Sequence, residues 1–100
     1  MDKKYEAIFI IKNYEDKEVL EDVLERINNI VITECGLIYH KDKIGVKKLA
    51  YEIKGNKQGY YYLINFKIPE FKIKDAIGRI SVSINTLEDI IKHIIIKIDE

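Results

Sequence analysis

The chain has 100 residues and a formal net charge of zero, with 47% hydrophobic and 34% charged residues. This composition suffices for the core of one domain, which we expect over residues 1–100, and its apolar runs are too short to cross a membrane. The polar N-terminal residues give no sign of a secretion signal, and the single Cys35 predicts a small core residue in a reducing cytoplasm.

The first elements predicted are a strand and a helix. Residues 4–12 are rich in β-branched and aromatic side chains, which favours a strand. From Lys17 to Val31, apolar side chains recur at the spacing of one helix face, and acidic residues crowd the first turn. Asp16 is the expected N-cap and Gly36 the stop signal.

The next segment predicts a long hairpin. Residues 37–53 favour a strand that bends at Gly45, residues 55–59 favour a turn, and residues 60–68 favour a second strand. The loop and the strand ends beside it are rich in lysine and tyrosine.

A second helix and a final strand complete the chain. Pro69 predicts the start of the helix, in which apolar residues recur at helical spacing. Gly78 lies inside it and costs about 1 kcal/mol relative to alanine, so we expect close packing at that position. Residues 90–98 predict the last strand. The order β-α-β-β-α-β indicates a ferredoxin-like α+β fold, a four-stranded antiparallel sheet with two helices on one face.

The strand pattern also predicts which side chains lie on each face of the sheet. We expect the following to lie under the helices: Ala7, Phe9, Ile11, Tyr62, Ile64, Phe66, His93 and Ile95. Residues of the opposite parity then face outward: Ile8, Ile10, Tyr61, Leu63, Ile94 and Ile96. A lone monomer rarely exposes so large an apolar patch. We therefore predict a protein-partner face there, or a surface for weak self-association of the free protein.

Charge is separated along the chain. Residues 13–34 contain seven carboxylates and two cations, whereas residues 40–58 contain six lysines and two carboxylates. The basic segment should attract phosphate and the acidic segment should repel it. Cations at a hairpin end beside a row of tyrosines suit a surface that touches RNA phosphates and bases.

Nothing in the sequence predicts an enzyme. The two histidines are His40, which we expect in a polar hairpin, and His93, which we expect packed within an isoleucine-rich strand. No cluster of histidine, cysteine and acidic residues has metal-binding spacing, and no glycine-rich phosphate loop occurs. We expect no cofactor and no metal.

The hairpin resembles the bacterial small-subunit ribosomal protein six family. The resemblance lies in the run Gly45-Val46-Lys47-Lys48-Leu49-Ala50-Tyr51-Glu52-Ile53, followed in the next strand by Lys57-Gln58-Gly59-Tyr60-Tyr61. It extends to the opening Lys3-Lys4-Tyr5-Glu6 and to the final strand, Asp89-Ile90-Ile91-Lys92-His93-Ile94-Ile95-Ile96-Lys97. The chain departs from the family pattern at Ile44, Val46, Glu52 and Ser83, where Trp, a basic residue, Pro and a nearby Arg are usual.

The resemblance implies a structural protein of the cytoplasmic ribosome. It would bind the central domain of 16S ribosomal RNA together with small-subunit ribosomal protein eighteen. From charge placement and resemblance together, we expect the following RNA contacts: Lys3, Lys4, Lys47, Lys48, Lys54, Lys57 and Lys92 to phosphates, and Tyr60 by stacking. The outward sheet face would receive the protein partner.

Two alternatives remain from the residues. The same topology serves RNA-recognition motifs, which bind single-stranded RNA through aromatic side chains on the open face. That alternative would require Phe9 and Tyr62 to face outward. A ferredoxin-like sensor of a small ligand is the other alternative, although no residue set defines its ligand.

Overall fold

The computed structural model describes residues 1–34 and 36–98, so the prediction for Cys35 lies outside the described residues. The elements are β1 (Asp2–Ile11), α1 (Lys17–Thr33), β2 (Leu37–Ile53), β3 (Asn56–Pro69), the short 3-10 helix η1 (Glu70–Lys72), α2 (Ile73–Asn85) and β4 (Ile90–Lys97). This order confirms the predicted β-α-β-β-α-β arrangement. No helix in the described part of the chain is both long and apolar enough to span a membrane.

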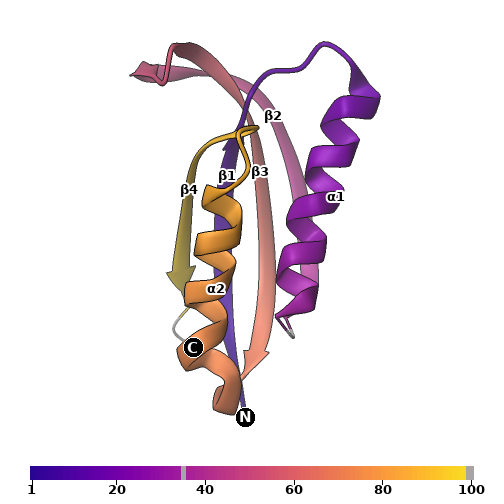
Figure 1. Cartoon of the computed structure of the whole chain (residues 1–100), viewed down its shortest axis with the longest axis vertical. Coiled ribbons are helices and arrows are strands. Elements are labelled where there is room, and N and C mark those ends of the chain that lie inside the picture. Colours follow the sequence, from indigo (N-terminus) through magenta and orange to yellow (C-terminus); the bar gives the residue numbers. More distant parts are fainter. Residues whose placement is uncertain (35, 99–100) are drawn as a thin grey trace.

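The four strands form one antiparallel sheet in the order β2-β3-β1-β4, and both helices cover the same face of it (Figure 1). Ala7 of β1 lies opposite Ile64 of β3 and Ile95 of β4, so the three side chains share one face. Its neighbour Ile8 lies opposite Leu63 and therefore faces the other way. The sheet places the two sets of side chains as the alternation predicts.

The core lies between the sheet and the helices. Ala7, Phe9, Ile64 and Phe66 are completely buried, and Tyr62 is 1% exposed. The helices contribute one apolar stripe each, listed in chain order: Val23, Leu24, Ile27, Val31, Ala76, Ile80 and Ile84. The predicted helix-covered face is thereby confirmed, with His93 and Ile95 half-buried at its β4 edge.

Local signals explain where α1 begins and where α2 differs from expectation. The Asp16 carboxylate accepts a hydrogen bond of 2.9 Å from the backbone N–H of Glu18, which confirms the predicted N-cap. The prediction of close packing at Gly78 was wrong. It lies on the exposed side of α2, and a Cβ atom built there would meet no atom within 4 Å. The chain thus carries the helix-destabilising effect of glycine without a close contact inside the monomer.

The β2–β3 hairpin bends at Gly45, as predicted, where φ is +105° and the register shifts. The prediction that residues 55–59 form the turn is wrong. Lys54 and Gly55 both have positive φ, 50° and 80°, and form a two-residue turn of the kind that matches strand twist. Residues 56–59 belong to β3. Residues 56–58 are polar and lie where the hairpin projects past the ends of the helices (Figure 1), so the apolar alternation that marks a half-buried strand is absent there.

Candidate nucleic-acid interface

The projecting part of the hairpin, residues 46–58, is called the hairpin arm below (Figure 1). Lys47 lies opposite Gly59, and Lys48 lies opposite Gln58. Because side chains alternate along a strand, these adjacent lysines point to opposite faces of the arm. The arm therefore carries cations on both faces, and a polyanion could contact it from either side.

The structure brings most of the predicted lysines together but not all of them. Four of the seven belong to the hairpin arm: Lys47, Lys48, Lys54 and Lys57. Lys92 on β4 lies opposite Ile10, which also lies opposite Tyr61, so Lys92 and Tyr61 flank one residue of the open face.

Lys3 and Lys4 lie apart from the arm, near the start of β1. Lys3 lies opposite Ile68, and Lys4 lies opposite Lys67, both at the far end of β3. The Lys3 ammonium is 4.0 Å from a carboxylate oxygen of Glu70. These two lysines therefore do not belong to the surface that the arm presents.

Tyr60, the predicted stacking residue, points toward the helix side. It lies opposite Val46 and Ile11 and packs against the core, partly buried. Its neighbour Tyr61 faces the open side, where the Lys47 ammonium lies 5.8 Å from the centre of the ring. Among the tyrosines of β3, Tyr61 is therefore the ring presented beside a cation, which the strand parity in the sequence could have indicated.

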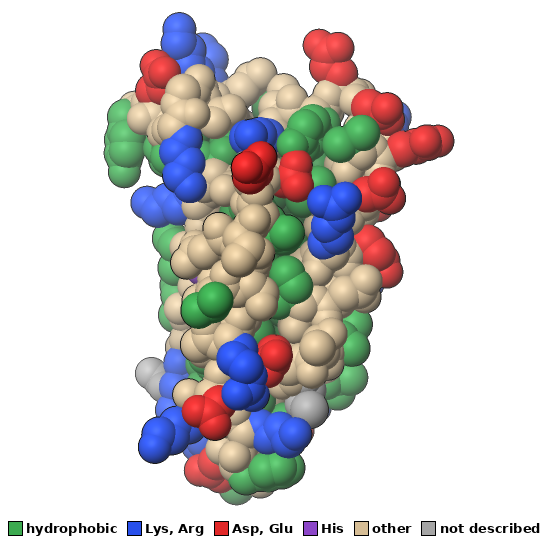
Figure 2. Space-filling view, viewed as in Figure 1, with side chains coloured by type: hydrophobic (Ala, Val, Ile, Leu, Met, Phe, Trp, Pro, Cys, Tyr) green, Lys and Arg blue, Asp and Glu red, His purple; other side chains and the backbone are tan. Residues whose placement is uncertain are grey.

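The acidic and basic segments form separate regions of the surface. In Figure 2, carboxylates gather over the start of α1 at the upper right, and lysines gather over the hairpin arm at the upper left. Lys43 links β2 to α1 through an ion pair of 2.7 Å with Glu21. The hydrogen bond to Glu21 raises the pKa of the Lys43 ammonium. Sequence reasoning missed this pair, because its members are on different elements.

The open face of the sheet is apolar and accessible at its β4 edge. Ile94 is 47% exposed and Ile96 is 50% exposed, while Ile8 and Leu63 are partly exposed beside them. Ile10 lies on the same face but is only 9% exposed. It packs beside Gly59, where a Cβ atom would come within 2.5 Å of its Cγ2 atom. Ile10 therefore offers little surface to a partner.

The face assignment also bears on the RNA-recognition-motif alternative. Phe9 is completely buried and Tyr62 is 1% exposed, both under the helices. Phe9 stacks on His93 with ring centres 6.4 Å apart, inside the same layer. Burial lowers the pKa of His93, with a smaller contribution from the positive charge of Lys54. The two rings that such a motif would offer to bases are not accessible.

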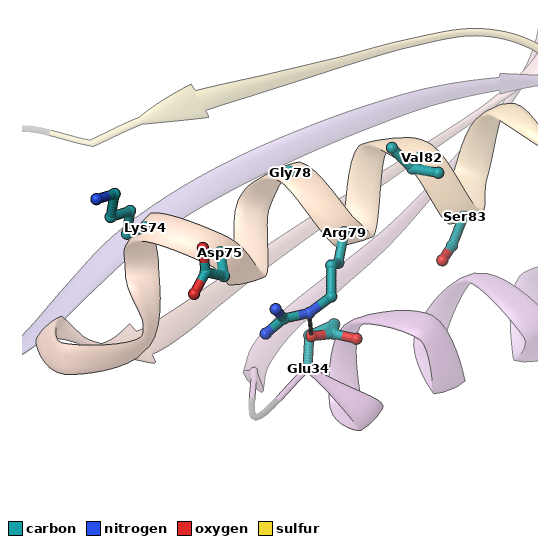
Figure 3. Close-up of a pocket in the computed structure, with 7 residues that line it drawn as sticks. All are labelled: Glu34, Lys74, Asp75, Gly78, Arg79, Val82 and Ser83. Atoms are coloured by element: carbon teal, nitrogen blue, oxygen red, sulfur yellow. Dashed lines mark hydrogen bonds and ion pairs between the residues drawn. The ribbon is translucent and has the colours of Figure 1, made fainter.

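A groove lies on the helix layer, away from every predicted site residue (Figure 3). The Arg79 side chain points from α2 toward Glu34 at the end of α1, and the two form an ion pair. This pair ties the helices together. Within the described part of the chain, no group of three or more histidine, cysteine or acidic side chains could hold a metal ion.

Comparison with known proteins identifies the family. The family model described as ribosomal protein S6 matches residues 4–97. Small ribosomal subunit protein bS6 of Clostridioides difficile (strain 630) is 34% identical over 94 residues, which cover 94% of this chain and 97% of that relative. The protein of the same name from Alkaliphilus metalliredigens (strain QYMF) is 33% identical over 97 residues, covering 97% of this chain and 98% of the relative.

A solved structure agrees with these relatives. The crystal structure of 30S ribosomal protein S6 from Thermotoga maritima superposes with a TM-score of 0.85 at 25% identity, covering 98% of this chain and 89% of that chain. On the sequence match, the fold and the full-length relatives together, the chain belongs to the ribosomal protein S6 family.

Proposed function

We propose that this chain is a non-catalytic constituent of the small ribosomal subunit that binds the central domain of 16S ribosomal RNA together with small-subunit ribosomal protein eighteen. The proposal takes residues 1–100 as one ferredoxin-like domain, because all four strands join one sheet. The protein would act in the ribosome, in the cytoplasm.

The observation that carries the proposal is that a lysine-rich surface and an apolar surface adjoin each other along the sheet. The hairpin arm presents lysines, and the open face beside it presents isoleucine and leucine side chains. The Lys47 ammonium over the Tyr61 ring lies where the two surfaces join. A lysine-rich arm suits RNA phosphates, and an apolar sheet face suits a folded protein.

The chain has a net charge of zero, so a basic protein partner would strengthen its attraction to RNA. Nonspecific attraction of the whole molecule to RNA is weak when positive and negative charge balance. A partner that covers the open face and adds its own basic surface would extend the contact with RNA. In the free protein, the same uncovered face would favour weak self-association.

The proposal is tested by asking where the protein goes in a bacterial cell. A tagged copy of the chain should sediment with the small ribosomal subunit in a sucrose gradient run at low magnesium, where the subunits separate. A variant with Lys48→Ala and Lys57→Ala together with Ile94→Glu should remain at the top of the gradient. Wild-type protein that stays at the top would contradict the proposal.

A further inference from the structure

The pairing of the two strands in the hairpin arm is irregular. Lys48 lies opposite Gln58, and Ile53 lies opposite Asn56. Between these two pairs β2 has the four residues 49–52, whereas β3 has only Lys57. The extra residues must bow β2 away from its partner strand, as in a β-bulge. Bulges of this kind often lie beside binding sites, because they re-aim side chains.

The bowed segment forms one wall of a groove of about 420 Å³. Residues 48–52 of β2 line it on one side, and Lys57 and Gln58 of β3 line it on the other. All of these residues belong to the hairpin arm, which projects past the ends of both helices (Figure 1), and all of them except the partly buried Leu49 are exposed.

Tyr51 is the aromatic side chain of this groove, and it is 67% exposed. Tyr5 stacks on Phe66, and Tyr62 donates a hydrogen bond to Asn28. Tyr51 has neither kind of interaction with any residue in the described ranges 1–34 and 36–98. The Tyr51 ring is therefore an exposed aromatic surface of the arm that stacks on no ring among the described residues.

Lys48 and Lys57 border the same groove from opposite strands. Neither forms an ion pair within the described residues, in contrast to Lys43, which is held by Glu21. Glu52 is the acidic side chain of the groove, so the charged groups that line it are two cations and one anion.

We propose that this groove binds one unpaired nucleotide of RNA, with its base stacked on Tyr51 and its flanking phosphates beside Lys48 and Lys57. The proposal rests on the proposed function, since it names a contact within the RNA surface. An exposed aromatic ring with cations on either side is the arrangement that single-stranded RNA uses, because every base has a face to stack and each nucleotide carries a phosphate. A protein anchor instead favours a closed apolar pocket, whereas this groove is open and is bordered by the charged side chains of Lys48, Glu52 and Lys57.

The test compares three variants of the full chain in the complex with small-subunit ribosomal protein eighteen on a central-domain 16S RNA fragment. Tyr51→Leu should weaken binding about 10-fold, because stacking on an aromatic residue is lost. Tyr51→Phe keeps the ring and should bind like the wild type. Tyr39→Leu is the matched control, since Tyr39 is also an exposed tyrosine of β2 but lies outside the groove.

Two further readouts separate stacking from other causes. The dependence of affinity on salt should be the same for Tyr51→Leu and the wild type, because no cation is removed. Ultraviolet irradiation of the wild-type complex should cross-link Tyr51 to a base, which mass spectrometry of the digested complex would locate. Thermal unfolding should show that all three variants fold, as expected for exposed positions.

Wild-type affinity for Tyr51→Leu would overturn the nucleotide site while leaving the proposed function intact. A loss of affinity confined to the protein partner, with no cross-link to RNA, would also overturn it and assign the groove to a protein contact. If the wild-type protein binds no RNA with or without the partner, the proposed function itself fails, and the nucleotide site fails with it.

Discussion

The Tyr62 hydroxyl on β3 donates a hydrogen bond of 2.8 Å to the Oδ1 atom of Asn28 on α1. Both residues are buried, with Tyr62 1% exposed and Asn28 8% exposed. This bond spans the apolar layer between the sheet and the first helix. Burial is the main cause that raises the pKa of the Tyr62 phenol, and the hydrogen bond to Asn28 acts in the opposite direction.

Replacement of Tyr62 by Phe should lower the free energy of unfolding by about 1–2 kcal/mol, because the buried Asn28 oxygen loses its donor. Urea titration followed by circular dichroism measures the change. Tyr60→Phe removes a hydroxyl from a partly buried ring two positions away, for which the described residues offer no such bond, and it should change stability by less than half as much. Equal effects of the two variants would show that the bond to Asn28 contributes little.

Gly78→Ala should stabilise the protein by up to about 1 kcal/mol, because alanine has the higher helix propensity and its Cβ atom meets nothing within 4 Å. The midpoint of urea unfolding measures it. Gly59→Ala is the opposite case, since its Cβ atom would lie 2.5 Å from the Ile10 Cγ2 atom and 3.2 Å from the Ile11 carbonyl oxygen. It should destabilise the protein by about 1–3 kcal/mol. A destabilising Gly78→Ala would mean that this position is strained in a way the packing does not reveal.

The raised pKa of Tyr14 predicts that the protein loses stability at alkaline pH. Its hydroxyl donates a hydrogen bond to Asp89 in the loop before β4, and this bond, followed by burial, raises the pKa of Tyr14 to about 12. The unfolded value is 10.0, so the folded state keeps its proton longer than the unfolded state. The stabilisation is fully present below pH 10 and disappears as the pH rises to about 12.

The variant Tyr14→Phe should therefore be less stable than the wild type at neutral pH and should lose less stability between pH 10 and pH 12. Urea unfolding at several pH values measures both quantities, and ultraviolet absorbance of the phenolate follows the titration directly. Parallel stability curves for the two proteins across that range would contradict the assignment to Tyr14.

On the hairpin arm, Lys48→Ala together with Lys57→Ala should weaken binding to central-domain RNA. The plot of log affinity against log salt should also become less steep, by about 1.4–1.8 if both lysines neutralise phosphates. A titration in a gel-shift series at several salt concentrations measures both. Lys43→Ala is the matched control, because its charge is already paired with Glu21. An unchanged slope for the double variant would remove both lysines from the RNA surface.

On the open face, Ile94→Glu should abolish binding of small-subunit ribosomal protein eighteen, because a charge would be buried without a partner in the interface. Ile94 is 47% exposed in the free chain, so the variant should still fold. Val82→Glu places the same charge at a 65% exposed position of α2 on the helix layer and should bind normally. Isothermal titration calorimetry measures both affinities. Ile10 is unsuitable for this test because it is buried.

Much of the fold could be predicted because local patterns and burial agree. The Asp16 cap, the apolar stripe of α1 and the bend at Gly45 each depend on neighbouring residues, and the structure confirms all three. The assignment of sheet faces followed from alternation along β1 and β3. The position of the turn was predicted wrongly because the arm lies outside the core, where the polar residues of a strand resemble a loop.

The site was predicted less completely, because its geometry depends on residues far apart in the sequence. Strand alternation could have indicated that Tyr60 points toward the helices. The ion pair of Lys43 with Glu21 joins two elements and has no signature in either. The bowed segment around Lys57 depends on a register shift between strands, which composition does not reveal.

The central claim is that this chain and its protein partner bind RNA as a pair. The most direct measurement is a gel-shift titration of a central-domain 16S RNA fragment with this protein alone, with small-subunit ribosomal protein eighteen alone, and with both. The account predicts a tight complex only when both proteins are present. Equal affinity of this protein for the fragment with and without the partner would contradict that claim, as would the absence of any complex with both.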